Sequence, residues 1–158
     1  MKHGTDTSAS FNVLLQKLKK YCAWRERCQQ EAVQKLHQLS AAPEQTKQIL
    51  QLLTDEGFLN NQRFARMFAQ GKLHNNKWGK QRIRMELLKR QIAEKDIRGA
   101  IEAIDENEYL KVLKQLMHGK REELLKKKDP FAKEKTLRYC IQKGYEPDLV
   151  WQEIDQLY

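Results

Sequence analysis

Apolar residues recur three and four positions apart along most of this chain, which is the spacing of one face of an α-helix. The clearest such segments are Phe11–Tyr21, Gln62–Leu73 and Glu108–Leu125. No stretch alternates apolar and polar residues for long enough to indicate a β-strand. The pattern therefore predicts an all-α protein.

A repeat of about 50 residues underlies this pattern. Cys28–Leu53, Gly79–Ile104 and Ala132–Leu157 align with one another at offsets of 51 and 53 residues. Each aligned segment reads as a helix, a short turn and a second helix. Three apolar columns support the alignment: Leu36, Leu87 and Cys140; Leu50, Ile101 and Ile154; and Leu53, Ile104 and Leu157.

Proline, glutamate and glycine mark where the helices begin and end. Pro43, Glu94 and Pro147 share one column, and both residue types suit the first turn of a helix. Gly57 and Gly144 follow apolar helical patterns and indicate helix ends. Asp129, followed by proline, indicates another helix start with the aspartate as N-cap.

Each helix pair is preceded by one amphipathic segment, so the chain is predicted to form three tandem three-helix modules in an extended, curved array. We expect a flexible tail at 1–7, a first module at 8–59, a second module at 60–104 and a third module at 105–158. A single globule of nine helices is the alternative that the repeat leaves open.

Positive charge is concentrated in the second module. Residues 60–98 contain eleven Lys and Arg but three Asp and Glu, which accounts for +8 of the chain's net +9. A localised positive field attracts polyanions and speeds encounter with them. The charge pattern therefore favours a nucleic-acid or acidic protein partner for this module.

Only some of these cations lack a carboxylate at helical spacing. Glu86 lies three or four residues from Arg82, Lys89 and Arg90, so Arg82 and Arg90 fit a solvated, paired face; Lys89 fits it only in part, because one carboxylate cannot neutralise three cations. The residues without such an acid are Lys72, Lys77, Lys80 and Arg84. The full candidate binding set is Arg63, Arg66, Lys72, Lys77, Trp78, Lys80, Arg82, Arg84, Lys89 and Arg90.

Aromatic residues near these cations read first as packing residues. Phe64 and Phe68 share one face of their helix, opposite Arg63 and Arg66, which favours packing over base stacking. Trp78 is expected to anchor the module's core, with a partner contact as the alternative.

Other chemistry is not indicated. Cys22, Cys28 and Cys140 show no metal-ligand spacing, and we expect reduced thiols in a cytoplasmic protein. We find no catalytic constellation, phosphate-binding loop, cofactor motif, signal peptide or membrane-spanning run. The expectation is a monomeric binding protein without cofactor, metal or membrane partner, and not an enzyme.

The second module also carries a family-like motif. The segments EGFLNNQRFARMFA, WGKQRIRMEL and KRQI resemble the signature of the RecX regulatory proteins, the modulators of the RecA recombinase. The matching positions are Gly57, Phe58, Leu59, Arg63, Phe64, Ala65, Gly79, Arg82, Ile83, Glu86, Leu87, Lys89 and Ile92. Asn61 replaces a common Asp and can still cap a helix. Gln91 replaces a common Gly, which argues against a left-handed turn there.

The resemblance implies an all-helical protein that binds along the groove of the RecA–DNA filament and restrains ATP hydrolysis and strand exchange in DNA repair and the SOS response. RecA and single- or double-stranded DNA are the partners it implies. The alternative is a helix-turn-helix DNA-binding protein that acts without a recombinase, with Ile97–Ile104 as recognition helix and Lys95 and Arg98 as its contacts. A helical scaffold that binds only proteins is a third interpretation.

Overall fold

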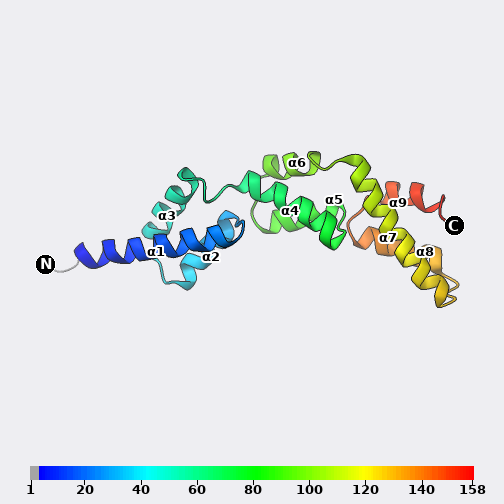
Figure 1. The fold of residues 1–158 in the computed structure, drawn as a ribbon, viewed down its shortest axis with the longest axis horizontal. Helices are drawn as coiled ribbons and strands as arrows, with labels where there is room; N and C mark the ends of the chain where they lie inside the picture. The colour runs from blue at the N-terminus through cyan, green and yellow to red at the C-terminus, as the bar shows by residue number, and fades with distance from the viewer. Residues whose placement is uncertain (1–3) are drawn as a thin grey trace. The chain divides into compact units, whose positions relative to one another are not determined.

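The computed structural model describes the backbone from Gly4 to Tyr158 and the side chains from Ser10 onward. This described part contains nine α-helices and no β-strand (Figure 1), so the all-α prediction is confirmed. The tail expected at 1–7 lies partly outside the described residues, and the first helix begins at Gly4.

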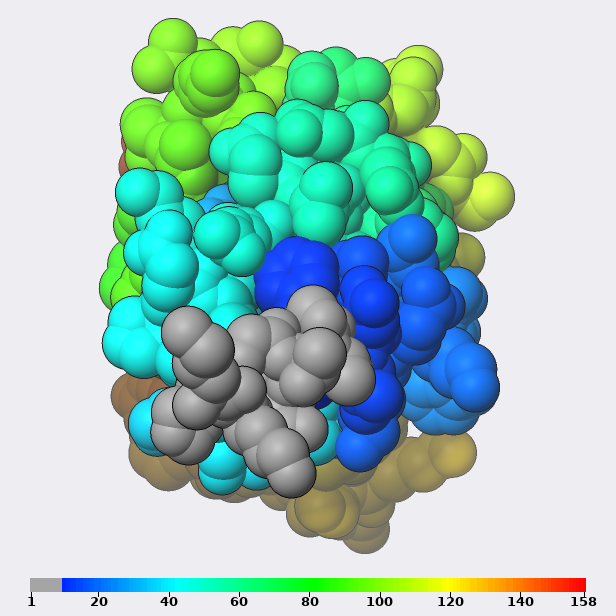
Figure 2. Space-filling view, turned by 90° about the vertical axis from the view of Figure 1, so that its left-hand side faces the viewer, coloured from blue at the N-terminus to red at the C-terminus, as the bar shows by residue number. Residues whose placement is uncertain are grey.

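The first three helices, α1 (Gly4–Trp24), α2 (Gln29–Gln38) and α3 (Pro43–Asp55), pack against one another. Seen end-on, the described start of α1 (blue) lies beside α3 (cyan to teal) in Figure 2. Their shared core consists of Leu14, Leu18, Cys22, Ala32, Leu36, Ile49, Leu53 and Leu59.

The next six helices follow in two further sets of three. The middle set is α4 (Asn61–Asn76), α5 (Lys80–Lys89) and α6 (Glu94–Glu102), with α5 packed on α6. The last set is α7 (Glu106–Lys126), α8 (Ala132–Gln142) and α9 (Pro147–Ile154). In it, α8 packs against both α7 and α9 (Figure 1).

By packing, the chain divides into two compact units. One contains the residues up to Phe64 together with Arg90–Ile92, and the other contains Ala65–Lys89 and Ala93–Tyr158. The second unit therefore holds most of the middle helices and all of the last three.

The helix boundaries follow the predicted repeat closely. The second helix of each pair begins at Pro43, Glu94 and Pro147, as predicted. The first apolar column is fully buried, since Leu36, Leu87 and Cys140 are each 0% exposed. In the other columns the side chains are buried or half-buried.

The turn inside each pair uses a left-handed residue at the same repeat position. Ser40, Gln91 and Gly144 have φ values of 58°, 58° and 104°. The inference against a left-handed turn at Gln91 was therefore wrong. The turn between two packed helices requires a positive φ in every module. Gln91 adopts it although, unlike glycine, it has a Cβ that makes this conformation less favourable.

Two capping assignments also differ from the sequence-based ones. Asn60, not Asn61, caps α4, because its Oδ1 accepts the N–H of Arg63 at 2.9 Å. Asn61 instead accepts the N–H of Gln29 at 3.0 Å and so caps α2. Both asparagines thus satisfy helix N-termini, Asn60 at its own helix and Asn61 at a helix 32 residues earlier in the chain.

The start of α8 shows a similar shift. The N-cap position is Phe131, and Asp129 accepts the Phe131 N–H at 2.9 Å ahead of the helix. This is an Asx-turn that precedes the first helical residue.

Within the second unit, the start of α5 meets the end of α8 at two glycines. The N–H of Gly79 donates to the carbonyl of Lys143 at 2.8 Å, and the N–H of Gln81 donates to the carbonyl of Gly144 at 2.9 Å. A Cβ on Gly79 would lie 2.3 Å from the backbone of Gly144, so the approach needs glycine. The carbonyls of the two residues that follow α8 therefore accept N–H groups at the start of α5.

Tyr109 closes the same junction from α7. Its buried hydroxyl accepts the N–H of Lys80 at 3.0 Å and donates to the carboxylate of Glu146 at 2.9 Å. The ammonium of Lys80 pairs with Glu106 and lies 4.5 Å from the centre of the Tyr109 ring. The Tyr109 hydroxyl is thus satisfied across the two helix sets, whereas the buried hydroxyl of Tyr145, whose ring packs on Tyr109, has no hydrogen-bond partner among the described residues.

Candidate functional site

Trp78 lies in the turn between α4 and α5 and is half-buried. Its N–H donates to the carbonyl of Lys72 at 3.0 Å, which closes the end of α4. Its ring meets Phe68 edge to face, with the ring centres 6.4 Å apart and the planes at 64°. The expected core-anchor role of Trp78 fits this packing, and the ring also contacts cations.

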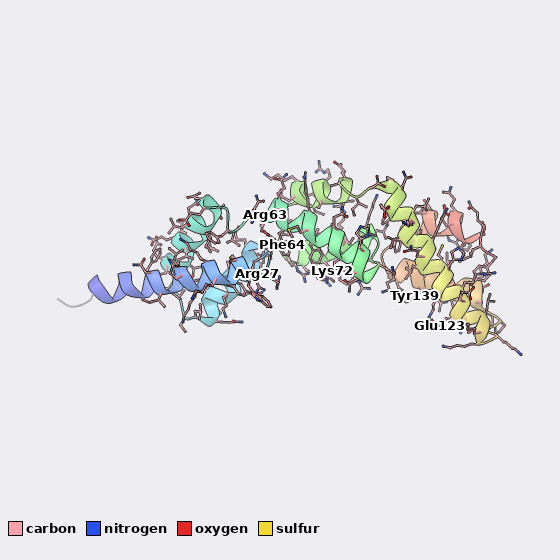
Figure 3. All side chains as sticks on the ribbon, in the orientation of Figure 1. Arg27, Arg63, Phe64, Lys72, Glu123 and Tyr139 are labelled. Atoms are coloured by element: carbon pink, nitrogen blue, oxygen red, sulfur yellow. The ribbon has the colours of Figure 1, made fainter. Side chains whose placement is uncertain are left out.

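Two cations lie over this ring. The Lys72 ammonium is 4.9 Å from the centre of the Trp78 ring and 5.4 Å from that of Phe68. The Arg82 guanidinium is 4.2 Å from the centre of the Trp78 ring. We call Phe68, Lys72, Trp78 and Arg82 the Trp78 cluster, and Lys72 is labelled on α4 in Figure 3.

The cluster orders its cations without neutralising them. A ring quadrupole attracts a cation but carries no net charge, so the two positive charges of Lys72 and Arg82 remain. Neither side chain has a carboxylate partner among the described residues. Two held, uncompensated cations beside an aromatic ring suit a phosphate or carboxylate partner.

Arg82 thus differs from the expectation that Glu86 pairs with it. Glu86 bonds Lys89 at 3.2 Å, one turn further along α5, while Arg82 turns back onto Trp78. The aromatic face one turn before Arg82 offers a contact that spacing between charges does not reveal.

Two further candidates, Lys77 and Arg66, have no carboxylate partner among the described residues. Lys77 precedes Trp78 with a φ of 56°, and its half-buried side chain has no described ion-pair partner. Arg66 is exposed on α4 and is likewise unpaired among the described residues.

The remaining candidates are engaged in contacts within the fold. Lys80 pairs with Glu106 at the glycine junction, and Arg84 pairs with Glu94 at the start of α6. Lys89 pairs with Glu86, and Arg90 also takes part in an interaction. These cations contribute to the positive electrostatic potential of the segment, but the carboxylates paired with them reduce that contribution.

Arg63 belongs to the first unit. Its Nε donates to Glu26 at 2.8 Å, and its Nη2 donates to the carbonyl of Gly57 at 3.0 Å. It therefore ties the start of α4 to the loop after α1 and to the end of α3. Phe64, beside it in Figure 3, is buried, in agreement with a packing role.

One cation near the cluster was not identified from the sequence. Lys143, from α8, donates to the carbonyl of Asn76 at 3.2 Å and reaches the last residue of α4. Nothing local in the sequence signals this contact, because the two residues are 67 positions apart.

Cys22, Cys28 and Cys140 are buried free thiols, and burial raises the pKa of Cys140 to about 12. Among the described residues, no His, Cys, Asp and Glu side chains gather in a group that could hold a metal ion. No helix in this part combines the length and apolar character needed to cross a bilayer.

Comparison with known proteins points to one family. Residues 60–101, the basic middle segment, match the second three-helix domain of RecX. The regulatory protein RecX of Lactobacillus johnsonii is 24% identical over 143 residues, which cover 90% of this chain and 53% of that protein. The chain thus spans about half the length of this curated relative.

Two solved structures share the fold. A crystal structure of a regulatory protein RecX aligns with a TM-score of 0.85 at 18% identity, over 96% of this chain and 74% of the other. RecX from Lactobacillus salivarius aligns with a TM-score of 0.81 at 16% identity, over 94% and 99%. The domain match lies on the basic middle segment and the curated relative covers most of the sequence, so this chain is similar to the RecX regulatory proteins and shares the fold of the two solved RecX structures.

Proposed function

We propose that this chain acts as a cytoplasmic monomer that binds the RecA–DNA filament and lowers its ATP hydrolysis and strand exchange. The proposal rests on the fact that the domain match and the positive charge fall on the same segment. The RecX domain match at 60–101 covers the segment that holds nearly all of the net positive charge. Within that segment, the Trp78 cluster presents two ordered and uncompensated cations.

Electrostatic attraction would bring the basic segment to the filament, and the bulk of the bound protein would then inhibit it. A nucleoprotein filament offers phosphates and acidic side chains to a basic surface, and a localised field favours that surface as the first contact. Lys72 and Arg82 would bind these anions, and Lys77, next to Trp78 in the chain, would add a third cation. A protein seated on the filament in this way would obstruct the subunit movements that accompany ATP turnover.

The test is a titration of RecA ATPase on single-stranded DNA. We expect the wild-type protein to inhibit, and the double variant Lys72→Ala/Arg82→Ala to inhibit about tenfold less well. Loss of two phosphate contacts should also lower the slope of log affinity against log salt by about two. Unchanged ATPase and strand exchange at low and moderate salt would refute the proposal.

The matched control lies in the same module. Lys95→Ala/Arg98→Ala also removes one lysine and one arginine, both exposed on α6. We expect this variant to inhibit like wild type. If it loses DNA binding while Lys72→Ala/Arg82→Ala keeps it, α6 is a recognition helix and the helix-turn-helix alternative holds.

A further inference from the structure

Trp24 is the most exposed large hydrophobic side chain among the described residues, at 81% exposure. It is the last residue of α1, so a regular helix holds its backbone. An indole presented to water on a fixed backbone gains stability when a flat partner covers it. Neither the RecX domain match nor the Trp78 cluster involves this residue.

A cation is held beneath this aromatic surface. The Arg27 guanidinium lies 3.8 Å from the centre of the Tyr21 ring and 5.8 Å from that of Trp24. Its Nε donates to the Tyr21 carbonyl at 3.1 Å, and the residue is only 6% exposed. Arg27 is labelled in Figure 3. Lys35 adds a second ammonium 5.5 Å from the centre of the Tyr21 ring.

Lysines extend this surface along α1. Lys17 and Lys20 precede Trp24 by seven and four residues, which places all three on one helix face. All three are exposed, and α1 has no acidic residue among its described side chains. The row from Lys17 to Trp24 is about 10 Å long at 1.5 Å per residue.

The nearby carboxylates are already paired inside the first unit. Glu26 accepts from Arg63 at 2.8 Å, and Glu31 accepts from Arg25 at 2.8 Å. The surface around Trp24 therefore keeps a net positive charge. A ligand that fits it has flat aromatic groups joined by a repeating negative charge.

We propose that Lys17, Lys20, Tyr21, Trp24 and Arg27 form a second binding surface, which takes single-stranded nucleic acid. An unpaired base stacks on the indole of Trp24, and Lys17 and Lys20 contact the adjoining phosphates. Arg27 fixes Tyr21 and supplies positive potential under the stacked base. This site lies in the first module and acts without the recombinase, so it does not depend on the proposed function.

The experiment measures binding of the full chain to fluorescently labelled oligothymidylate by anisotropy, with no recombinase present. A strand of equal length with abasic sites keeps the phosphates and removes the bases. We expect wild type to bind oligothymidylate about tenfold more tightly than the abasic strand, since one stacked base contributes a factor of about 5 to 160. Trp24→Ala should bind both strands equally, at the lower affinity.

The matched control is Trp151→Ala, which removes the 51% exposed indole of α9. It should bind both strands like wild type. Lys17→Ala/Lys20→Ala should weaken both strands alike and lower the salt slope by about two. Circular dichroism of each variant checks that the helices remain.

Unchanged oligothymidylate binding by Trp24→Ala would overturn the inference, and so would an equal loss on both strands. If that variant instead keeps oligonucleotide binding but loses the RecA–DNA filament, the indole is a protein contact, which also overturns it. The two proposals separate cleanly, because Lys72→Ala/Arg82→Ala tests recombinase inhibition while Trp24→Ala tests stacking without recombinase.

Discussion

The glycine junction between α5 and α8 predicts a large effect from one methyl group. In Gly79→Ala the new Cβ would lie 2.3 Å from the carbonyl carbon of Gly144 and from the amide nitrogen of Tyr145. These are backbone atoms, which cannot rotate away as a side chain can. The two helices would therefore have to separate.

Separation breaks the two hydrogen bonds that join the helices, from Gly79 and Gln81 to the carbonyls of Lys143 and Gly144. Each such bond contributes about 0.5–1.5 kcal/mol, so their loss lowers the free energy of unfolding by about 1–3 kcal/mol. For a chain of this size each kcal/mol corresponds to about 2–4 °C in melting temperature.

Urea unfolding followed by circular dichroism measures the effect. The control is Gly119→Ala in the middle of α7, where an added Cβ meets nothing within 4 Å. That variant should gain about 0.5–1 kcal/mol, because alanine favours a helix interior over glycine. If Gly79→Ala unfolds at the wild-type urea concentration, the described close approach of the two helices is wrong.

Three further outcomes are expected from the structure. Arg63→Ala should lower the free energy of unfolding by about 1–2 kcal/mol through loss of its bonds to Glu26 and Gly57, while Arg66→Ala on exposed surface should change it by less than about 0.5 kcal/mol in the same urea assay. Gln91→Gly should raise it by about 1 kcal/mol, because glycine adopts the left-handed turn without strain; a loss of stability would contradict the φ of 58°. Burial raises the pKa of Cys140 from 9.0 to about 12, so the folded state holds that proton more tightly. Its contribution to stability is complete below about pH 9 and lost as pH rises toward 12; urea unfolding across this range should show a smaller fall for Cys140→Ala.

Features governed by neighbouring residues could be predicted from the sequence. The starts at Pro43, Glu94 and Pro147 follow from the chemistry of the first helical turn, and the buried column at Leu36, Leu87 and Cys140 follows from helical periodicity. These rules act over a few residues, so the sequence displays them directly.

Features that join distant residues could not be predicted in this way. The spacing of charges along the sequence indicated no ion-pair partner for Lys80. In the structure it pairs with Glu106, 26 residues further along the chain. Arg84 likewise forms an ion pair with Glu94 of the next helix, α6. The same reasoning paired Arg82 with Glu86, because it counted charges and not the aromatic ring of Trp78. The partner of a surface cation depends on packing between helices, which a single sequence does not display.

The contact between α8 and α5 also restricts how an anion can be recognised here. A glycine followed by a lysine at a helix start commonly offers free N–H groups and the positive end of the helix dipole to a phosphate. At Gly79 and Gln81 those N–H groups already donate to the carbonyls of Lys143 and Gly144, just after α8. Backbone recognition of a phosphate is thus blocked at this helix start, and any anion bound by the middle module must be held by side chains.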